Sequence, residues 1–312
     1  MKLCVLGEYL IDFTPQGKTE LGLPLYAQNP GGAPTNVACA AAKLGVSAGV
    51  ITKISTDALG CFLYNYLKAL SVVDMRGVLR SDDPTGLAFV SLREDGEREF
   101  TFFRNGCADS MLTEQDIDTA LIEECEVFHF SSVSLVSEPA RSATLYAAAL
   151  AKSLGKTVSF DINYRPLLWQ SETEAKLQVG RALKVADIVK ASEEEAALFG
   201  FGVVAAPAVF LAKGAKLVLL TFGSEGSAFY TAEHSADVPA FSVKAVDATG
   251  AGDNFMGAFL AALIRSEKKP SQLTENELYE MLRYANAAGA VCASRYGAIA
   301  GQATPEDISA ML

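Results

Sequence analysis

The stretch ADIVKASEEEAALFG, residues 186–200, and the run AKLVLLTFG that follows at residues 215–223 decide the fold class. The apolar runs at either end are short, as in buried strands, and the segment between them has the composition of a helix that ends at Gly200. The order strand, helix, strand is typical of a unit whose two strands lie parallel in one sheet.

The same alternation extends toward the N-terminus. Further strands are expected at residues 2–7, 48–55, 126–132 and 156–162, and further helices at residues 33–45, 56–70 and 139–155. This order predicts an α/β fold whose central, mostly parallel sheet is covered by helices on both faces. We expect the 312 residues to form a single domain of this kind with a small accessory piece.

Two segments interrupt the alternation. Residues 9–32 are polar and turn-rich, and residues 85–105 have the pattern of a hairpin that turns at Asp95-Gly96. Together, over about 10–30 and 84–107, they are predicted to form a small β-sheet that covers a site as a lid. The alternative is a pair of surface hairpins without a functional role.

Composition excludes several classes of protein. With 26 basic and 37 acidic residues the chain carries a net charge of −11, which argues against binding to nucleic acid or to anionic membranes. The N-terminus has no signal-peptide pattern, and the longest apolar runs fall short of the roughly 20 residues that span a bilayer. Six scattered cysteines and two histidines argue against a zinc site and favour reduced thiols in the cytoplasm.

A glycine-rich stretch, VDATGAGDNFMGAF at residues 246–259, leads into a further helix-like segment. It is not a P-loop, because the Gly-Lys-Thr triplets of this chain, at 17–19 and 155–157, lack the first glycine of that motif. It is not a dinucleotide fingerprint either, because Phe255 stands where the third glycine belongs.

The stretch nevertheless suits a phosphoryl group. Gly250, Ala251 and Gly252 precede or begin the helix, where backbone N–H groups lack helical partners and the helix dipole is positive. Asp253 follows directly and is positioned to accept the proton of an attacking hydroxyl. The alternative is that Asp253 only stabilises the helix start, by a few tenths of a kcal/mol.

DATGAGD at residues 247–253 resembles the second signature of the ribokinase-like (PfkB-type) carbohydrate kinases, D-T-x-G-A-G-D, with Ala248 in place of the usual Thr. NPGGAPTNVACAAAKLG at residues 29–45 resembles the first signature of the same family. The resemblance extends over essentially the whole chain, and GEYLIDF at residues 7–13 together with the DxNYRPxLW pattern at 161–169 is closest to the fructokinase branch.

The resemblance implies a ribokinase-like fold and an ATP-dependent sugar kinase that converts fructose to fructose 6-phosphate. Asp253 would be the catalytic base, and the backbone of Gly250, Ala251 and Gly252 would bind the phosphoryl group. Arg104 is expected to be an exposed arginine at the end of the lid hairpin. Six residues would bind the sugar: Asp12, Gly31, Gly32, Asn36, Arg104 and Arg165. Asp12 fits this role on physical grounds as well, because it follows the first strand, at the sheet edge where such folds bind ligands.

The resemblance also implies sites for the nucleotide and for ions. Six residues would bind ATP: Ser192, Glu195, Thr221, Gly223, Gly226 and Asn286. Glu195 would also hold Mg²⁺ through water, although Ser192 stands where the family has Asn. A monovalent cation such as K⁺ would lie near five residues, Asp247, Thr249, Cys292, Arg295 and Gly297.

Other functions stay open from the sequence alone. The substrate of the kinase could be 2-keto-3-deoxygluconate, ribose or a nucleoside-like riboside. A non-catalytic sugar or nucleotide sensor on the same fold is a candidate of another class, but a pure binding protein has no need of Asp253 as a base. The partners expected are a small sugar and ATP, and the family leads us to expect a homodimer formed through the lid.

Overall fold

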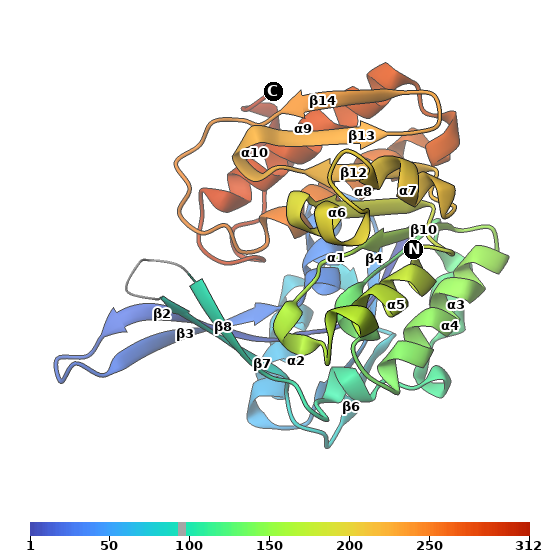
Figure 1. The fold of residues 1–312 in the computed structure, drawn as a ribbon. Helices are drawn as coiled ribbons and strands as arrows, with labels where there is room; N and C mark the ends of the chain where they lie inside the picture. Colours follow the sequence, from blue (N-terminus) through green and yellow to red (C-terminus); the bar gives the residue numbers. More distant parts are fainter. Residues whose placement is uncertain (93–97) are drawn as a thin grey trace.

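The computed structural model of the protein describes residues 1–92 and 98–312. Its centre is a ten-stranded sheet with the strand order β14-β13-β12-β11-β10-β9-β1-β4-β5, in which β6 also pairs with β4 (Figure 1). The strands are β1 (Leu3–Leu6), β4 (Ala48–Ser55), β5 (Val73–Asp74), β6 (Val78–Ser81), β9 (Val127–Ser131), β10 (Thr157–Asp161), β11 (Ile188–Ser192), β12 (Leu217–Thr221), β13 (Gly226–Tyr230) and β14 (Ser235–Pro239).

This sheet is parallel except at one edge. All pairs from β5 and β6 across to β12 are parallel, and the pairs β12–β13 and β13–β14 are antiparallel. The central strands are short apolar runs that are buried along their whole length, as expected where helices cover both faces. The predicted mostly parallel sheet is therefore confirmed.

Helices cover the two faces of the sheet and give it two hydrophobic cores. Leu3 and Val5 of β1 point into one core, and Cys4 and Leu6, the alternate residues, point into the other. The first core is covered by α1 (Ala33–Lys43), α2 (Ala58–Leu70), α8 (Ala251–Ser266), α9 (Glu275–Ala293) and α10 (Pro305–Ser309). The second is covered by α3 (Thr119–Glu124), α4 (Ala140–Ser153), α5 (Glu172–Ala182), α6 (Glu193–Phe199) and α7 (Ala206–Ala212).

Short 3₁₀ helices complete the described elements. They are η1 (Ala108–Met111), η2 (Glu114–Asp116), η3 (Ser132–Leu135), η4 (Pro166–Leu168), η5 (Gly223–Glu225) and η6 (Pro270–Gln272). None of the helices in the described ranges has both the length and the apolar composition required to cross a membrane.

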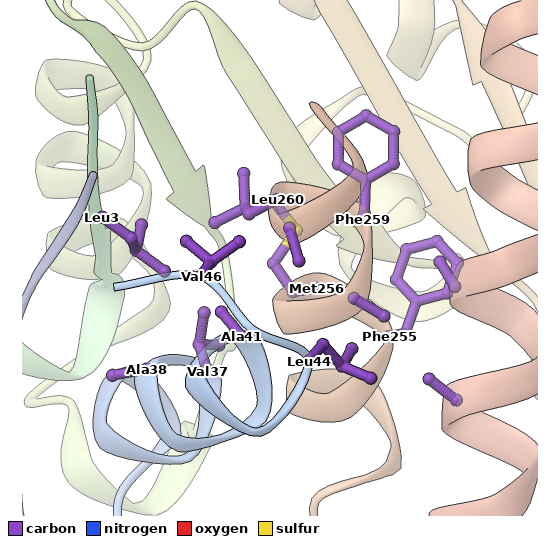
Figure 2. Packing of buried hydrophobic residues seen from close by; sticks show 14 of the residues in the cluster. Leu3, Val37, Ala38, Ala41, Leu44, Val46, Phe255, Met256, Phe259 and Leu260 are labelled. Atoms are coloured by element: carbon purple, nitrogen blue, oxygen red, sulfur yellow. The ribbon is translucent and has the colours of Figure 1, made fainter. Parts of the chain in front are cut away.

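Helices α1 and α8 pack closely against each other in the first core (Figure 2). Val37 and Ala41 of α1 and Met256 of α8 are fully buried there, and burial of a large apolar side chain contributes about 1.5–3 kcal/mol. Gly257 makes the close approach possible, because a Cβ atom at this position would lie 2.6 Å from Cβ of Ala40. The contact fixes the N-terminal turns of both helices relative to each other.

A second, four-stranded sheet projects from the body of the molecule (Figure 1). Its strand order is β3-β2-β7-β8, formed by β2 (Leu10–Lys18), β3 (Pro24–Gly31), β7 (Leu87–Leu92) and β8 (Arg98–Phe103). Strands β2 and β7 pair in parallel, and the other two pairs are antiparallel. The predicted separate small sheet is confirmed, whereas the predicted turn at Asp95-Gly96 lies outside the described residues.

The two faces of this small sheet differ in character. Asp12, Ala88 and Phe102 are neighbours across three strands on one face. On the other face Phe89 stacks on Phe13, with 4.7 Å between the ring centroids, and contacts Tyr26 and Phe103 edge-on. We call these four aromatic residues, Phe13, Tyr26, Phe89 and Phe103, the outer lid face. Phe103 is 59% exposed, so this face is only partly covered.

Candidate active site

A cavity of about 810 Å³ lies where the small sheet meets the carboxyl ends of the central strands. Parallel α/β sheets bind ligands at this edge, because the loops that follow the strands converge there. The lining comes from the β1–β2 segment (Glu8, Leu10, Asp12), the start of α1 (Gly32, Ala33, Asn36), the small sheet (Val90, Phe102, Arg104), the loop after β10 (Asn163, Tyr164, Arg165, Pro166, Leu168), the segment from β11 into α6 (Lys190, Ser192, Glu194, Glu195, Leu198), the start of α8 (Ala248, Thr249, Gly250, Gly252, Asp253) and Val133.

The start of α8 forms one wall of the cavity. Gly250 caps the helix in a left-handed conformation with φ of 78°, and a Cβ atom there would lie 2.4 Å from Cβ of Ala298. Only glycine suits this position, for both reasons. Ala251 is one of the residues predicted to hold the phosphoryl group. Its amide already donates a hydrogen bond to the carbonyl of Ala248 at 3.2 Å, so this amide has a partner within the chain.

Asp253 lies in the first turn of α8 and reaches across to α1. Its Oδ2 accepts a hydrogen bond from Nδ2 of Asn36 at 2.8 Å. The pKa of Asp253 is raised to about 6, mainly by burial and in part by the charge of Asp161, while Asn36, Lys190 and Arg165 act in the opposite direction. At neutral pH the carboxyl group of Asp253 is thus ionised in most molecules, yet it is basic enough to accept a proton.

Asp12 and Gly32 line the cavity as well, whereas Gly31 lies against the carboxylate of Asp12 and is not among the described residues that line the cavity. Burial raises the pKa of Asp12 to about 7, and the nearby charge of Asp253 adds to the shift. A Cβ atom on Gly31 would lie 2.0 Å from Oδ2 of Asp12, and one on Gly32 would lie 2.2 Å from the carbonyl oxygen of Glu8. Both glycines are therefore required by the close approach of neighbouring chain segments.

The two predicted arginines line the same cavity but differ in environment. Arg165 follows β10 and is exposed, and its Nη1 donates to the carbonyl of Tyr164 at 3.1 Å. The expectation of an exposed Arg104 was wrong: only 10% of its side chain is exposed, and Nη2 forms an ion pair with Asp109 of η1. The reason is that the chain turns inward directly after β8 and brings η1 beneath the guanidinium group.

Sequence reasoning missed a buried ion pair at the floor of the cavity. Nζ of Lys190 in β11 lies 3.0 Å from Oδ2 of Asp161 in β10. Burial alone would lower the pKa of Lys190, but the charge and hydrogen bond of Asp161, together with the charges of Glu195 and Asp253, outweigh burial and the pKa is raised. A Cβ atom on Gly252 would lie 3.3 Å from this Nζ, so the ammonium group faces the start of α8. A lysine inside an otherwise apolar strand was the available signal, because lysine is rarely buried without a partner.

Glu8 was also missed. It follows β1 directly, is only 4% exposed, and its Oε1 accepts a hydrogen bond from the amide of Ala33 at 2.9 Å. Burial raises the pKa of Glu8 to about 7, and the charge of Arg104 partly offsets this. A carboxylate placed directly after a buried strand was the signal that could have identified it.

Ser192 and Glu195 lie together at the start of α6, as predicted neighbours of the cavity. They form a capping box, in which Oγ of Ser192 accepts from the amide of Glu195 and Oε2 of Glu195 accepts from the amide of Ser192 at 2.8 Å. Oε1 of Glu195 accepts from the amide of Tyr164 at 2.6 Å. Both carboxylate oxygens of Glu195 therefore have backbone partners.

Four other residues are predicted to bind the nucleotide, and none of them is among the described residues that line this cavity: Thr221, Gly223, Gly226 and Asn286. Thr221 ends β12 and pairs in register with Ser192, so the two loops are adjacent. Gly223 and Gly226 have φ values of 56° and 112°, which the turn between β12 and β13 requires. Asn286 of α9 accepts from Oγ of Ser227 at 2.9 Å and donates to the carbonyl of Val238 at 3.0 Å, so its amide joins α9 to β13 and β14.

Four of the five residues predicted near a monovalent cation are brought together by two loops. Asp247 accepts hydrogen bonds from the amides of Thr249, at 3.0 Å, and Gly297, at 3.1 Å, and Sγ of Cys292 lies 3.6 Å from the carbonyl oxygen of Thr249. Arg295 instead forms a two-point ion pair with Asp307, with contacts of 2.8 and 2.6 Å. Within the described ranges no three His, Cys, Asp or Glu side chains cluster as metal ligands would.

The whole chain is similar to known proteins. A family model described as pfkB family carbohydrate kinase matches residues 1–305. The probable fructokinase-5 of Arabidopsis thaliana is 41% identical over 313 residues, covering 98% of this chain and 95% of that protein. A fructokinase of Xylella fastidiosa with bound ATP has a TM-score of 0.91 at 30% identity and covers 99% of this chain and 97% of its own.

A second solved structure adds a sugar. The fructokinase of Vibrio cholerae O395, in its fructose, ADP and calcium ion bound form, has a TM-score of 0.91 at 31% identity and covers 100% of this chain and 99% of its own. Family, relatives and solved structures thus agree over nearly the full length of the chain. The chain belongs to the pfkB family of carbohydrate kinases.

Proposed function

We propose that the protein is an ATP-dependent fructokinase, which transfers the γ-phosphate of ATP to the primary hydroxyl of fructose and forms fructose 6-phosphate. The observation that carries the proposal is the position of Asp253. It is a carboxylate with a pKa of about 6, bonded to Asn36 and close to Lys190, at a helix start inside a cavity of about 810 Å³. Similarity to fructokinases over nearly the whole chain supports fructose as the sugar.

The sugar would be bound by the residues around Asp12. A carboxylate accepts hydrogen bonds from sugar hydroxyls, and the side-chain amide of Asn36 both donates and accepts. Gly31 and Gly32 support this site, because the space that their Cβ atoms would fill is taken by the carboxylate of Asp12 and the carbonyl oxygen of Glu8. Arg104 and Arg165 supply donors from opposite sides of the cavity.

Asp253 would act as the general base. As the oxygen of the primary hydroxyl forms its bond to phosphorus, the proton of that hydroxyl moves to the carboxylate of Asp253, which Asn36 holds in place. The ammonium group of Lys190, which faces Gly252, and the first-turn backbone of α8 at Gly250, Ala251 and Gly252 would balance the negative charge of the phosphoryl group. The small sheet limits access of water, which would otherwise accept the phosphoryl group.

ATP would approach from the β12 side, along Ser192, Thr221, Gly223 and Gly226, with Asn286 supporting the strands behind. A divalent cation, Mg²⁺, neutralises phosphate charge when it is bound with the nucleotide. Glu195 fits an indirect role, through water, because both of its oxygens accept backbone hydrogen bonds.

A monovalent cation such as K⁺ would lie between the loops that carry Asp247 and Gly297. Asp247, Thr249, Cys292 and Gly297 suit this site, because hydrogen bonds hold them together where the two segments meet. Arg295 would contribute only its backbone, since its side chain pairs with Asp307.

We further propose that the protein forms a homodimer through the outer lid face. Phe13, Tyr26, Phe89 and Phe103 make a continuous aromatic cluster, and the exposed Phe103 and Tyr26 would be covered by a second copy. A cytoplasmic location completes the proposal, in keeping with six cysteines that are all thiols.

The substrate is tested by measuring ATP consumption with a panel of ketoses, aldoses, sugar acids and ribosides. Fructose should give the highest kcat/KM, and the product should carry its phosphate on C6, which phosphorus and carbon NMR can assign. A sugar acid or riboside that exceeds fructose by more than tenfold, or about 1.4 kcal/mol in transition-state binding, would contradict fructose and leave the kinase assignment intact. If no sugar of the panel leads to consumption of ATP, the result would favour a non-catalytic sensor instead.

A further inference from the structure

Two buried groups of opposite charge lie close together in the cavity without pairing. Glu8 follows β1 in the core, and Arg104 follows β8 in the small sheet. Both line the same cavity, and the charge of Arg104 lowers the pKa of Glu8, against the larger effect of burial. No direct ion pair joins these two side chains in the part of the chain that the structure describes.

Each group has one polar atom bound to the protein and one without a partner. Oε1 of Glu8 accepts from the amide of Ala33, and Nη2 of Arg104 donates to Asp109. Oε2 of Glu8 and Nη1 of Arg104 are both buried and have no hydrogen-bond partner among the described residues. An unsatisfied buried polar atom costs about 1–3 kcal/mol, so an acceptor and a donor left unsatisfied in one cavity indicate that a bound group completes both.

A hydroxyl group has the chemistry to satisfy both atoms. Oε2 of Glu8 can only accept a hydrogen bond when ionised, and Nη1 of Arg104 can only donate. A hydroxyl donates one hydrogen bond and accepts others, so a single hydroxyl can join the two. An amine or a phosphate would satisfy one of the atoms and repel the other.

The contacts of the charged groups identify the end of the sugar. Asp253 accepts its hydrogen bond from Asn36 of α1, whereas Glu8 accepts one from the amide of Ala33, the first residue of the same helix. Arg104 pairs with Asp109 of η1, on the side of the small sheet. Glu8 and Arg104 thus lie at the end of the cavity away from Asp253. The phosphoryl group is accepted at the other end, beside Asp253.

We infer that Glu8 and Arg104 together bind one ring hydroxyl of the sugar, on the side away from the hydroxyl that is phosphorylated, and that Glu8 is a specificity-determining residue. The inference rests on the proposed sugar kinase function. Because Glu8 belongs to the core and Arg104 to the small sheet, the bound hydroxyl also links these two parts of the molecule. A sugar without this hydroxyl leaves both charged groups unsatisfied and is rejected for that reason.

The test is Glu8→Gln combined with deoxy analogues of the sugar. Glutamine keeps an oxygen for the amide of Ala33, but it turns a donor instead of an acceptor toward the hydroxyl. The KM for fructose should rise at least about tenfold, while kcat, the KM for ATP and the melting temperature change little. The analogues are 1-deoxy-, 3-deoxy- and 4-deoxyfructose and 2,5-anhydromannitol. One of them should lose at least about tenfold in kcat/KM with the parent enzyme and less than about threefold with Glu8→Gln.

A second variant guards against a failure of Glu8→Gln to fold. Arg104→Lys keeps the charge next to Asp109 and removes the second guanidinium nitrogen. It should weaken discrimination against the same analogue, and its effect should not add to that of Glu8→Gln. Thr52→Val is the matched control: Oγ1 of Thr52 is also buried without a partner in the described chain, but Thr52 does not line the cavity. Its KM values should equal those of the parent.

Three outcomes overturn or separate the proposals. An unchanged KM for fructose in Glu8→Gln, or equal losses with every analogue in variant and parent, would leave Glu8 as a hydrogen-bond acceptor for α1 only. If the parent does not phosphorylate fructose, the proposed function fails independently. The same deoxy series, made from the sugar that the parent does accept, then decides the role of Glu8.

Discussion

Asp253 has two properties that a mutation can separate, its shape and its basicity. Asp253→Asn keeps the shape and the contact to Asn36 but cannot accept a proton. Turnover should fall by about 10²–10⁴, the usual contribution of a general base, while fructose and ATP bind within a few-fold of the parent. Calorimetry and steady-state kinetics measure the two effects. Turnover near the parental rate would reduce Asp253 to a charge that stabilises the start of α8.

Asp12→Ala is the comparison for that experiment. It removes hydrogen-bond acceptors from the sugar and leaves the base in place, so fructose binding should weaken by about 1–3 kcal/mol. ATP affinity should be unchanged.

The pH dependence of kcat/KM should reveal both carboxyl groups. Burial raises the pKa of Asp253 to about 6 and that of Asp12 to about 7. As the pH falls through this range both take up protons, so Asp253 can no longer accept one and Asp12 loses acceptor capacity. A plot of log kcat/KM for fructose should therefore fall below about pH 7 with a slope greater than one, because Glu8, whose pKa is also raised to about 7 by burial, takes up a proton in the same range. Asp12→Asn should make the fall less steep. A profile that stays flat to pH 5 would contradict the assignment.

Lys190 and Asp161 can be tested as a pair. Lys190→Met leaves Asp161 buried without its partner, which should cost about 3–5 kcal/mol of folding free energy. The double variant Lys190→Met/Asp161→Asn should recover much of the melting temperature. If Lys190 stabilises the phosphoryl group, turnover should remain about 10²–10³ below the parent in both variants. Recovery of turnover together with stability would show that the pair is structural only.

Residues were predictable where a motif or a strand end marks them. Asp253, Asn36 and Asp12 all line the cavity, as expected. Lys190 and Glu8 were missed because strand periodicity assigns such positions to the core, and only the cost of burying a charge marks them as unusual. Arg104 was misjudged because its partner Asp109 lies beyond the hairpin, and no local pattern predicts that the chain turns inward there.

At the scale of elements, the start of α8 depends on Gly250. Gly250→Ala would place a side chain at φ of 78° and 2.4 Å from Cβ of Ala298, so the first turn must shift. Turnover should drop at least about tenfold, and the melting temperature should fall by several degrees, as a cost of about 1–2 kcal/mol implies.

Gly180→Ala is the matched control for this element. Gly180 lies within α5, and a Cβ atom there would meet nothing within 4 Å. The substitution should stabilise the protein by about 0.5–1 kcal/mol and leave the kinetics unchanged. Equal effects of the two substitutions, measured by thermal unfolding and assay, would contradict a special role for the start of α8.

The elements themselves were largely predictable, but their pairing was not. Apolar runs and helix composition predict the strands and helices of the central sheet, because buried strands and amphipathic helices have different sequence periods. The parallel pairing of β2 with β7 joins residues that are far apart in the chain, Ile11 with Leu87 and Phe13 with Phe89. Sequence pattern carries no information on such a pair.

At the scale of the whole molecule, the outer lid face predicts association. Phe103→Glu would place a charge in the aromatic cluster and should convert a dimer to a monomer, measured by sedimentation velocity. Leu177→Glu on α5 is the control, because Leu177 and Phe103 are both 59% exposed. The control should leave the oligomeric state unchanged. A parent that sediments as a monomer at micromolar concentration would refute the dimer.

The hydrogen bond between Asn36 and Asp253 joins residues that are 217 positions apart. During translation α1 therefore leaves the ribosome long before α8; β1 and β4 can cover part of its apolar face, but the part that packs against α8 stays uncovered until then. Nascent chains that stop short of α8 carry Asp12 and Asn36 but lack the proposed base, so we expect them not to consume ATP. They also expose the surface that α8 would cover, which makes them substrates for chaperones and proteases. The newly made enzyme thus acquires activity and protection from degradation in the same late step.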